Sequence, residues 1–581
     1  MGRWVQWTTA VVLLGCAPFA VAGPESTAAP DAPPPAKPSL SSRIDPVDLQ
    51  RPPGIPDDAT LEAEGARVGT ITLRALEVFD TSRADERNWL FETANRLHVG
   101  TRKATIADRL LFREGDVYEG RLLQESERLL RAARFLYDAS VRPVRYVDGR
   151  VDIEVITRDV WTLNPGVSFG RKGGKSTSGF ELEELNLFGR GTQVNVKKTN
   201  DVDRDITSAR YVDRQLGSTW WALEAEHSDF SDGGARRLLL EHPFYALDVR
   251  LAGGFAADDS ERIDTRYDRG TPVAEYRVDS RLRSAWVGVS RGLREGRVTR
   301  WSVGFTADER KFGGIPASVL QTALPADRKL VYPWIDVEWL QDDFRAARNL
   351  DQIGRTEDFQ YGWRVDARLG YSSTAFGADR DAWVFSSRIS RGIEWGAASE
   401  TRTLATAKPQ QTLLFAAALA GRHEDDAFAD LLLSGSARYY RRQSERRLFF
   451  AGLSVDIGEN LDADRELMLG GDTGLRGYPL RYRGGQGRWL LTLEQRVYTD
   501  WYPFRLFHVG AAAFVDAGGT WGRDPFARQR SGVLGDAGVG LRLGNSRSGL
   551  GNVIHVDLAF PLGAEKSIDS MQLLIETKRS F

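Results

Sequence analysis

The residues that most often perform chemistry in enzymes are few and scattered in this chain. There is one cysteine, Cys16, and the six histidines stand at 98, 227, 242, 423, 508 and 555, without the spacing of a metal site. No G-x-S-x-G element marks a serine nucleophile. The stretch GGKSTS at 173–178 lacks the first glycine of a phosphate-binding loop, because Phe169 stands there. We therefore expect no enzyme activity, no metal and no cofactor.

Charge and hydrophobicity narrow the class of protein further. The 581 residues include 78 lysines and arginines and 80 acidic residues, a net charge of -2. This balance provides no positive field for nucleic acid, so nucleic-acid binding is not expected. After the N-terminus there is no run of 18 or more apolar residues, which argues against helices that span a membrane. Strands that expose only alternate residues to lipid would escape this test.

The first 66 residues predict export and a linker. Residues 1–22 resemble a signal peptide, with Arg3, an apolar stretch at 11–14 and the small-x-small site Ala20-Val21-Ala22. In a second interpretation, Leu13-Leu14-Gly15-Cys16 is a lipobox and Cys16 is lipidated. Either way the chain leaves the cytoplasm. Residues 23–66 are rich in proline, which predicts an extended or disordered linker without a helix.

Residues 67–163 predict a small α+β domain. A strand pattern at 68–73 is followed by helical spacing at 85–98 and 119–134, and then by strand patterns at 139–147 and 151–156. Asp148-Gly149 predicts a tight hairpin turn between the last two strands. A sheet of three strands leaves an exposed edge, to which an extended peptide can add a strand. In the alternative, water covers this edge and the domain only orients the rest of the chain.

From residue 164 onward, polar and apolar residues alternate in stretches that often exceed about ten residues. In one stretch Trp363, Val365, Ala367 and Leu369 share a face, and Arg364, Asp366 and Arg368 share the other. An apolar face and a charged face predict an all-β transmembrane barrel of antiparallel strands, with lipid outside and a polar lumen. We expect aromatic girdles at the membrane surfaces from Tyr332, Trp334, Trp339, Trp489, Tyr498, Trp501 and Tyr502.

Three stretches resemble the BamA/TamA superfamily of outer-membrane assembly and translocation proteins. The first, at 110–141, is LLFREGDVYEGRLLQESERLLRAARFLYDASV and is similar to the second-helix region of a POTRA domain. The second, VDIEVITRDVWTL, is similar to that domain's last strand. The third is the turn NLFGRG, with Asn186, Gly189 and Gly191. The resemblance implies one POTRA domain at 67–163 and a 16-stranded barrel at 164–581. The residues alone give up to about twenty alternating stretches, and we attribute the surplus to hairpins outside the membrane.

The most specific motif is LMLGGDTGLRGYPLRYRGGQG at 467–487. It resembles the superfamily's long loop that folds back into the lumen, tipped here by Arg476, Gly477 and Tyr478. The resemblance implies that Arg476 reaches acids of the inner wall, matched by Glu494 and by Asp516 in an F-x-D-x-G pattern ending at Gly518. A guanidinium in a confined lumen needs such a carboxylate partner. After this loop we expect five strands, at 488–499, 507–517, 536–545, 552–563 and 571–580, and Phe581 as the barrel's C-terminal assembly signal.

The resemblance implies a function in outer-membrane protein insertion or translocation, with the barrel in the outer membrane and the POTRA domain in the periplasm. The expected partners are unfolded outer-membrane or secreted client proteins, outer-membrane lipids and accessory periplasmic proteins. Two alternatives stay open. One is a dedicated two-partner-type secretion translocator. The other is a passive porin or structural barrel, which would need neither a POTRA domain nor the arginine loop.

Overall fold

The computed structural model describes residues 51–578 except 85, 316–323, 397–409, 523–531, 550–552, 564 and 566. The predicted leader at 1–22, Cys16, most of the segment 23–66 and Phe581 lie outside these residues. In the part of the chain that is described, no helix is long and apolar enough to cross a membrane.

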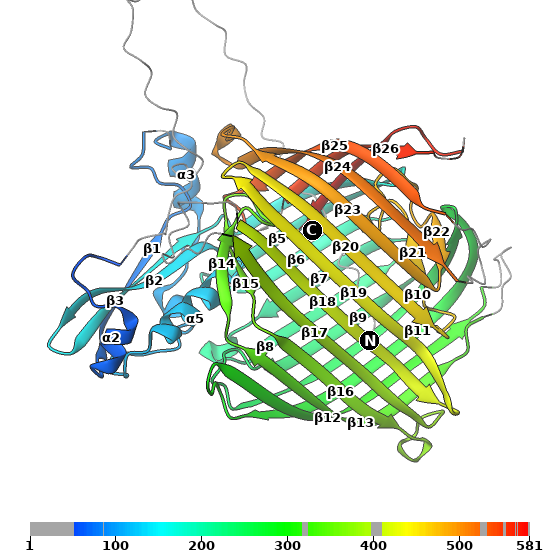
Figure 1. The fold of residues 1–581 in the computed structure, drawn as a ribbon, viewed down its shortest axis with the longest axis horizontal. Helices are drawn as coiled ribbons and strands as arrows, with labels where there is room; N and C mark the ends of the chain where they lie inside the picture. The colour runs from blue at the N-terminus through cyan, green and yellow to red at the C-terminus, as the bar shows by residue number, and fades with distance from the viewer. Residues whose placement is uncertain are drawn as a thin grey trace, which may run out of the picture.

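A small domain, called here the front domain, precedes the barrel (Figure 1). It contains α2 (Asp58–Ala63), β1 (Arg67–Leu76), α3 (Trp89–Leu97), α4 (Lys103–Ala107), α5 (Gly120–Arg131), β2 (Leu136–Val147) and β3 (Arg150–Asp159). Its sheet has the order β1-β3-β2, with β3 in the middle and parallel to β1. The tight turn between β2 and β3 has positive φ at Asp148 and Gly149, as expected for a two-residue hairpin loop. The three predicted strands and the two predicted helices, found as α3 and α5, are present in the predicted order, and α4 is an additional helix between them.

One prediction for the N-terminal linker is wrong. Residues 58–63 form α2, although we expected no helix between 23 and 66. The last proline, Pro56, precedes the helix, so it breaks none of the helix's hydrogen bonds. The Asp57 side chain caps the helix by accepting a hydrogen bond from the Thr60 N–H at 2.8 Å. Leu61 is fully buried in the front domain's core, which holds the helix in place.

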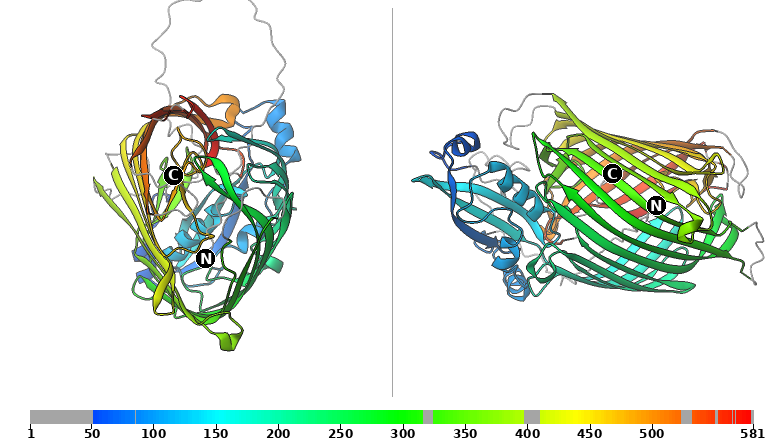
Figure 2. Two further views of the ribbon diagram at one scale, coloured as in Figure 1. Left: turned by 90° about the vertical axis from the view of Figure 1, so that its right-hand side faces the viewer. Right: turned by 90° about the horizontal axis from the view of Figure 1, so that it is seen from below.

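The rest of the chain forms a closed barrel of 20 strands, in which neighbours are antiparallel. The barrel strands are β4 (Leu163–Lys172), β5 (Lys175–Leu187), β6 (Thr192–Asn200), β7 (Asp205–Asp213), β8 (Ala222–Phe230), β9 (Gly233–His242), β10 (Leu251–Asp268), β11 (Thr271–Ser290), β12 (Arg297–Gly313), β13 (Arg328–Gln341), β16 (Arg364–Ser372), β17 (Ala382–Gly396), β18 (Gln410–Glu424), β19 (Ala427–Ser444), β20 (Arg447–Glu459), β23 (Gly487–Tyr498), β24 (Phe507–Trp521), β25 (Leu534–Asn545), β26 (Val553–Leu562) and β27 (Gln572–Lys578). Figure 2 shows the closed ring along the barrel and the front domain at one end.

The expected number of 16 strands is wrong. A tilted strand needs only about 9–11 residues to cross a membrane, and nearly every alternating stretch of this chain meets that length. The stretches that we assigned to hairpins outside the membrane are strands of the wall. The five strands expected after the lumen motif are present as β23 to β27.

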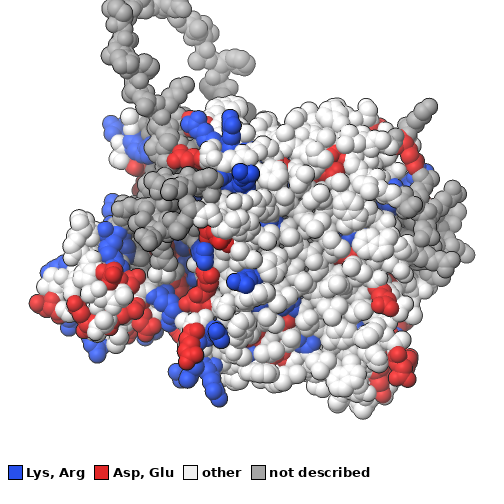
Figure 3. All heavy atoms as spheres, in the orientation of Figure 1, with Lys and Arg blue, Asp and Glu red and all other residues white. Residues whose placement is uncertain are grey.

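The two faces of the wall have opposite character. Large apolar side chains are exposed on the outside, among them Val287, Val303, Ile335, Leu369, Leu433, Leu453, Val515, Val539 and Phe560. On the face shown in Figure 3, charged side chains gather on the front domain and at the barrel end beside it, and the wall is largely free of them. The alternation at 363–369 is as expected, since Leu369 is exposed and Arg368 pairs with Asp336 at 3.2 Å.

Three of the expected girdle residues belong to the lumen instead. Tyr332, Trp334 and Tyr498 are buried. Trp334 donates a hydrogen bond to Thr306 at 2.9 Å and lies under the Arg368 guanidinium. All three occupy positions whose side chains point into the lumen, because alternate residues of a strand face opposite sides. The position of each residue along its strand, and not its aromatic character, therefore sets the face on which it lies.

Candidate functional site

The loop between β20 and β23, residues 460–486, folds back into the barrel, and we call it the lumen loop. It contains a short hairpin, β21 (Leu467–Leu469) and β22 (Arg483–Gly485). Its tip lies against the inner wall: the Gly477 N–H donates to Asp536 at 3.0 Å, and the Tyr478 hydroxyl donates to the Gly535 carbonyl at 3.2 Å. A Cβ at Gly477 would stand 2.7 Å from the Asp536 Cβ, so only glycine permits this approach.

Arg476 lies at the centre of a buried cluster of charges. Its guanidinium contacts Asp516 through two hydrogen bonds of 2.7 and 3.0 Å, in the paired geometry of a bidentate fork. A third nitrogen lies 3.3 Å from Glu494 and 3.0 Å from Asp557. Arg476 is only 3% exposed, and its guanidinium stacks on the Phe514 ring. The structure thus brings together the three charged residues that the motif singled out.

Two further arginines complete this cluster, and sequence reasoning missed them together with Asp557. Arg542 donates to Glu494 at 3.0 Å and to Asp557 at 2.5 Å, and Arg496 donates to Glu494 at 2.9 Å. Three guanidinium groups therefore face three carboxylates, which is how a buried charge is tolerated. The signal in the sequence is an ionisable residue on the lumen face of each of the neighbouring strands β23 to β26.

Of the other predicted residues, Gly518 makes room for the lumen loop. A Cβ there would stand 2.8 Å from the Trp489 carbonyl oxygen and 3.0 Å from the Leu469 side chain. Leu469 belongs to the hairpin within the lumen loop, so the F-x-D-x-G pattern supplies both the carboxylate and the space beside it.

The lumen loop is also fastened to the opposite wall. Its acidic residues Asp462, Asp464 and Glu466 pair with arginines of four different strands. These pairs are Arg422–Asp462 at 2.8 Å, Arg328–Asp462 at 2.6 Å, Arg310–Asp464 at 2.8 Å and Arg266–Glu466 at 3.0 Å. The loop is therefore held at both sides of the lumen, and it crosses the barrel from wall to wall.

A second segment enters the lumen from the end beside the front domain. Residues 342–363, which include β14 (Phe344–Arg348) and β15 (Thr356–Gln360), connect β13 to β16, and we call them the floor hairpin. Leu350 and Ile353 pack inside the barrel among Tyr440, Leu448, Phe450, Tyr498 and Val553. Asp351 accepts hydrogen bonds from Arg438 at 3.0 Å and from the Tyr440 hydroxyl at 2.6 Å.

The tip of the floor hairpin is organised by a buried carboxylate. Glu357 accepts hydrogen bonds from the backbone N–H groups of Leu350, Asp351 and Gln352, at 3.0 to 3.1 Å. Burial, with the negative charge of Asp351 nearby, raises the pKa of the Glu357 carboxyl to about 8. The Leu350 carbonyl accepts a hydrogen bond from Arg496 at 2.8 Å. Arg496 therefore contacts both the floor hairpin and Glu494 of the charge cluster.

The front domain holds the outer side of the floor hairpin. Arg131 of α5 forms two hydrogen bonds with Asp358, at 2.8 and 2.6 Å. The Tyr137 hydroxyl donates to the Gly354 carbonyl at 2.9 Å, and Thr356 donates to Asp138 at 2.7 Å. The hairpin thus lies between the front domain and the lumen and contacts both.

The turn NLFGRG, between β5 and β6, contacts the front domain. Asn186 is fully buried, donates to the Thr101 hydroxyl at 2.9 Å, and accepts from the Gly191 N–H at 2.6 Å. The Gly189 carbonyl accepts from the Arg102 N–H at 3.0 Å. Both glycines have positive φ, and Gly191 leaves a Cβ no room beside Phe135. We predicted a tight turn here, and its contacts with the front domain are an additional finding.

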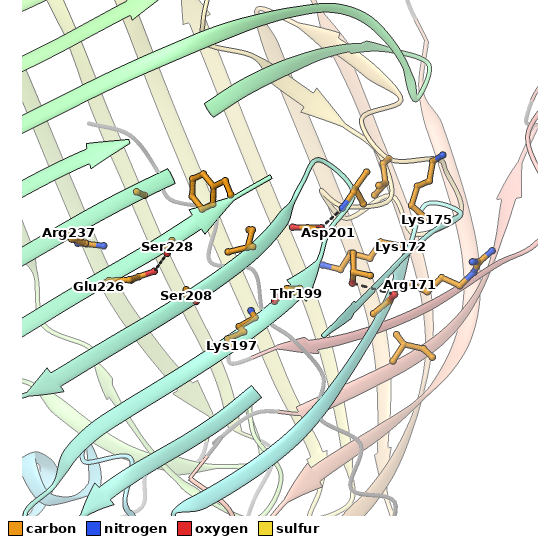
Figure 4. Close-up of a pocket in the computed structure, with 18 of the residues that line it drawn as sticks. Arg171, Lys172, Lys175, Lys197, Thr199, Asp201, Ser208, Glu226, Ser228 and Arg237 are labelled. Atoms are coloured by element: carbon orange, nitrogen blue, oxygen red, sulfur yellow. Dashed lines mark hydrogen bonds between the residues drawn. The ribbon is translucent and has the colours of Figure 1, made fainter. Parts of the chain in front are cut away.

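Beside the lumen loop there is a cavity of about 270 Å³ on the inner wall. Side chains of β4 to β10 line it, together with Leu480 of the lumen loop (Figure 4). Lys175, Lys197 and Arg237 lie near Asp201 and Glu226, so its lining carries both signs of charge. Lys172 is paired with Glu576 of β27 at 2.7 Å. The lumen is thus filled on the side of the charge cluster and hollow on the side of β5 to β9.

The fold and these contacts define a class of protein: a closed β-barrel with an apolar outer face, whose lumen is entered from both ends by segments of its own chain. No family model matches the sequence, and no curated protein matches it. Among solved structures, the chain is similar to CdiB from Escherichia coli, with 14% identity, a TM-score of 0.45, and coverage of 88% of this chain and 76% of that one.

Two other solved structures are similar at the same level. CdiB from Acinetobacter baumannii has 13% identity, a TM-score of 0.41, and coverage of 88% and 73%. BamA from Haemophilus ducreyi lacking POTRA domains 1-3 has 12% identity, a TM-score of 0.34, and coverage of 87% and 85%.

Proposed function

We propose that this chain is an outer-membrane protein that inserts or exports other polypeptides, and that the structure represents its closed state. The observation that carries the proposal is that two segments of the chain occupy the lumen, the lumen loop from one end and the floor hairpin from the other. A passive porin needs a permanent aqueous path. A barrel that passes or releases polypeptides must instead open on demand and stay sealed between events.

The front domain is, in this proposal, a POTRA-type module that receives the client on the periplasmic side. Three features support it: the α+β order of the domain, its position at one end of the barrel, and its contacts with the floor hairpin. β2 is an edge strand, whereas β3 is central and cannot accept a further strand. The first half of β2 is already covered, since the Val141 N–H donates to Glu127 and the Leu136 carbonyl accepts from Arg355. We infer that a client strand would pair with residues 142–147.

The first prediction concerns location. The mature protein should fractionate with outer membranes and should migrate faster on gels when it is not heated, because a closed barrel resists detergent until its strand hydrogen bonds break. Recovery of the protein in the soluble periplasm would contradict the proposed function altogether.

The second prediction concerns the client. A photo-crosslinking residue at Arg145 or Val147 of β2 should capture newly made outer-membrane or secreted polypeptides in cells. The matched control is Arg113, which is also exposed on the front domain but does not belong to an edge strand. Captured outer-membrane proteins would favour insertion, and a single secreted protein would favour a two-partner-type translocator. Equal capture at all three positions would show that the edge does not bind clients.

A further inference from the structure

The front domain exposes a group of large apolar side chains beside the barrel. Trp89 and Leu97 of α3 are 75% and 70% exposed, and Leu90 and Val99 are also exposed. Single exposed apolar residues need no explanation, but a contiguous apolar patch on a soluble domain usually marks an interaction surface.

The patch follows from the arrangement of residues around α3. At 100° per residue, Trp89, Leu90, Thr93 and Leu97 lie within one third of the helix circumference. Phe91 and Ala94 occupy the neighbouring third and pack against Val78 and Phe79. The helix therefore has a second apolar face beside the one that the domain buries, and none of the described residues of the domain covers that second face.

This surface is continuous with the outer wall of the barrel. Phe79 and Phe91 pack against Leu506, which follows η3 (Pro503–Arg505) in the turn between β23 and β24. In that turn Trp501 and Phe504 are 64% and 77% exposed. Val497 and Val515, on the two strands that the turn connects, are exposed on the apolar outside of the wall. In Figures 1 and 2, α3 lies at the rim of the barrel end and not beneath its centre.

The charges around the patch have predominantly one sign. Exposed basic residues lie on α3, at the start of α4, and in the turns before α3 and between β5 and β6: Arg87, Arg96, Arg102, Lys103 and Arg190. The exposed acids beside it are Glu92 of α3 and Glu77, whose carboxylate accepts a hydrogen bond from Asn95 of α3. Tryptophan, phenylalanine and leucine flanked by arginine and lysine are the composition of segments that lie in a membrane interface and contact anionic headgroups.

We propose that α3, Val99 and the β23–β24 turn together dock on the surface of the membrane that surrounds the barrel, at the barrel end beside the front domain. The ligand is a phospholipid leaflet with anionic headgroups. Aromatic side chains would lie at the level of the headgroups, and the arginines would contact phosphate. Docking would fix the front domain at the barrel rim and leave the free half of β2 directed away from the membrane.

The test places a nitroxide label at Leu97 of the full-length chain. The variant is Leu97→Cys in a Cys16→Ser background, reconstituted in vesicles of phosphatidylethanolamine and phosphatidylglycerol. Collisions with oxygen, which concentrates in lipid, are compared with collisions with a water-soluble nickel chelate. The matched control is Val147→Cys, an apolar and exposed position at the β2–β3 turn. We expect the Leu97 label to favour oxygen several-fold over the control, and the preference to weaken when phosphatidylglycerol is left out.

Two outcomes would overturn the docking proposal. Equal behaviour of the two labels would show that the patch faces water. Protection of the Leu97 label from both collision partners would show that protein covers it, as in a contact between copies of the chain. Neither outcome bears on the closed lumen, so the proposed function is tested separately.

Discussion

Replacement of Arg476 by alanine is expected to release the lumen loop and to abolish most of the protein's activity. The substitution leaves Asp516 without its bidentate partner, and breaking a buried ion pair on one side costs on the order of 3–5 kcal/mol. Part of this free-energy cost is recovered when the lumen loop leaves its site, because water then solvates the Asp516 carboxylate. The barrel should remain folded, because its strand ladders do not involve Arg476. Limited trypsin digestion of reconstituted protein should cut the loop at Arg481 or Arg483 in the variant and spare it in the wild type.

Three further variants show whether the charge cluster acts as a unit. Arg476→Lys should also fail in large part, since an ammonium keeps the charge but loses the planar fork. Asp516→Ala should resemble Arg476→Ala, and the double variant should be little worse than either single one. Arg483→Ala is the matched control, because Arg483 belongs to the same loop but donates to the Gly532 carbonyl outside the cluster. Additive defects in the double variant, or an equal defect in the control, would refute a shared role for Arg476 and Asp516.

Removal of the floor hairpin's tip is expected to open the barrel to ions. Replacing residues 349–355 with glycine and serine removes Leu350 and Ile353 from the lumen, together with the bonds of Asp351. In planar bilayers the wild type should conduct little and the replaced protein should show brief openings. Combined with Arg476→Ala, which frees the other closure, the replacement should give a lasting pore. The same replacement of the turn 291–296, at the same barrel end, should leave conductance low. An unchanged current in the combined variant would disprove that the hairpin seals the lumen.

The closure should also depend on pH through Glu357. The pKa of this carboxyl is raised from its ordinary value of 4.5 to about 8 in the closed state, so closure favours the protonated form. The stabilisation of the closed hairpin by protonated Glu357 is fully present below about pH 4.5 and is lost as the pH rises towards 8. Openings of the wild type should therefore become more frequent over this interval, and Glu357→Gln should remove the dependence.

The barrel could be predicted from the sequence because each strand shows the alternation of polar and apolar residues within its own length. The sequence also predicted the order of elements in the front domain, where Asp148-Gly149 and the helical spacing are equally local. Arg476, Glu494 and Asp516 were found because a motif connects them. Asp557, Arg496 and Arg542 belong to no motif, and only the register of neighbouring strands brings them to the same place.

Other features could not be predicted from the sequence, for a different reason. The floor hairpin is a mixture of charged, polar and apolar residues that looks like an ordinary connection between strands. Its role depends on the diameter of the barrel and on the front domain beside it, and neither is encoded locally. For Tyr332 and Trp334, aromatic character suggested the membrane surface, but strand register directed both side chains inward.

Arg496 contacts the floor hairpin with one nitrogen and Glu494, the neighbour of Arg476, with another. The two closures enter from opposite ends of the barrel, yet they share this one side chain. By thermodynamic reciprocity, if release of the hairpin makes release of the lumen loop easier by a given factor, release of the loop makes release of the hairpin easier by the same factor. A polypeptide that pulls on the front domain, and through Arg131 on Asp358, would therefore be sensed at the opposite mouth of the barrel before it entered the lumen. Opening of one end of the barrel would then favour opening of the other end.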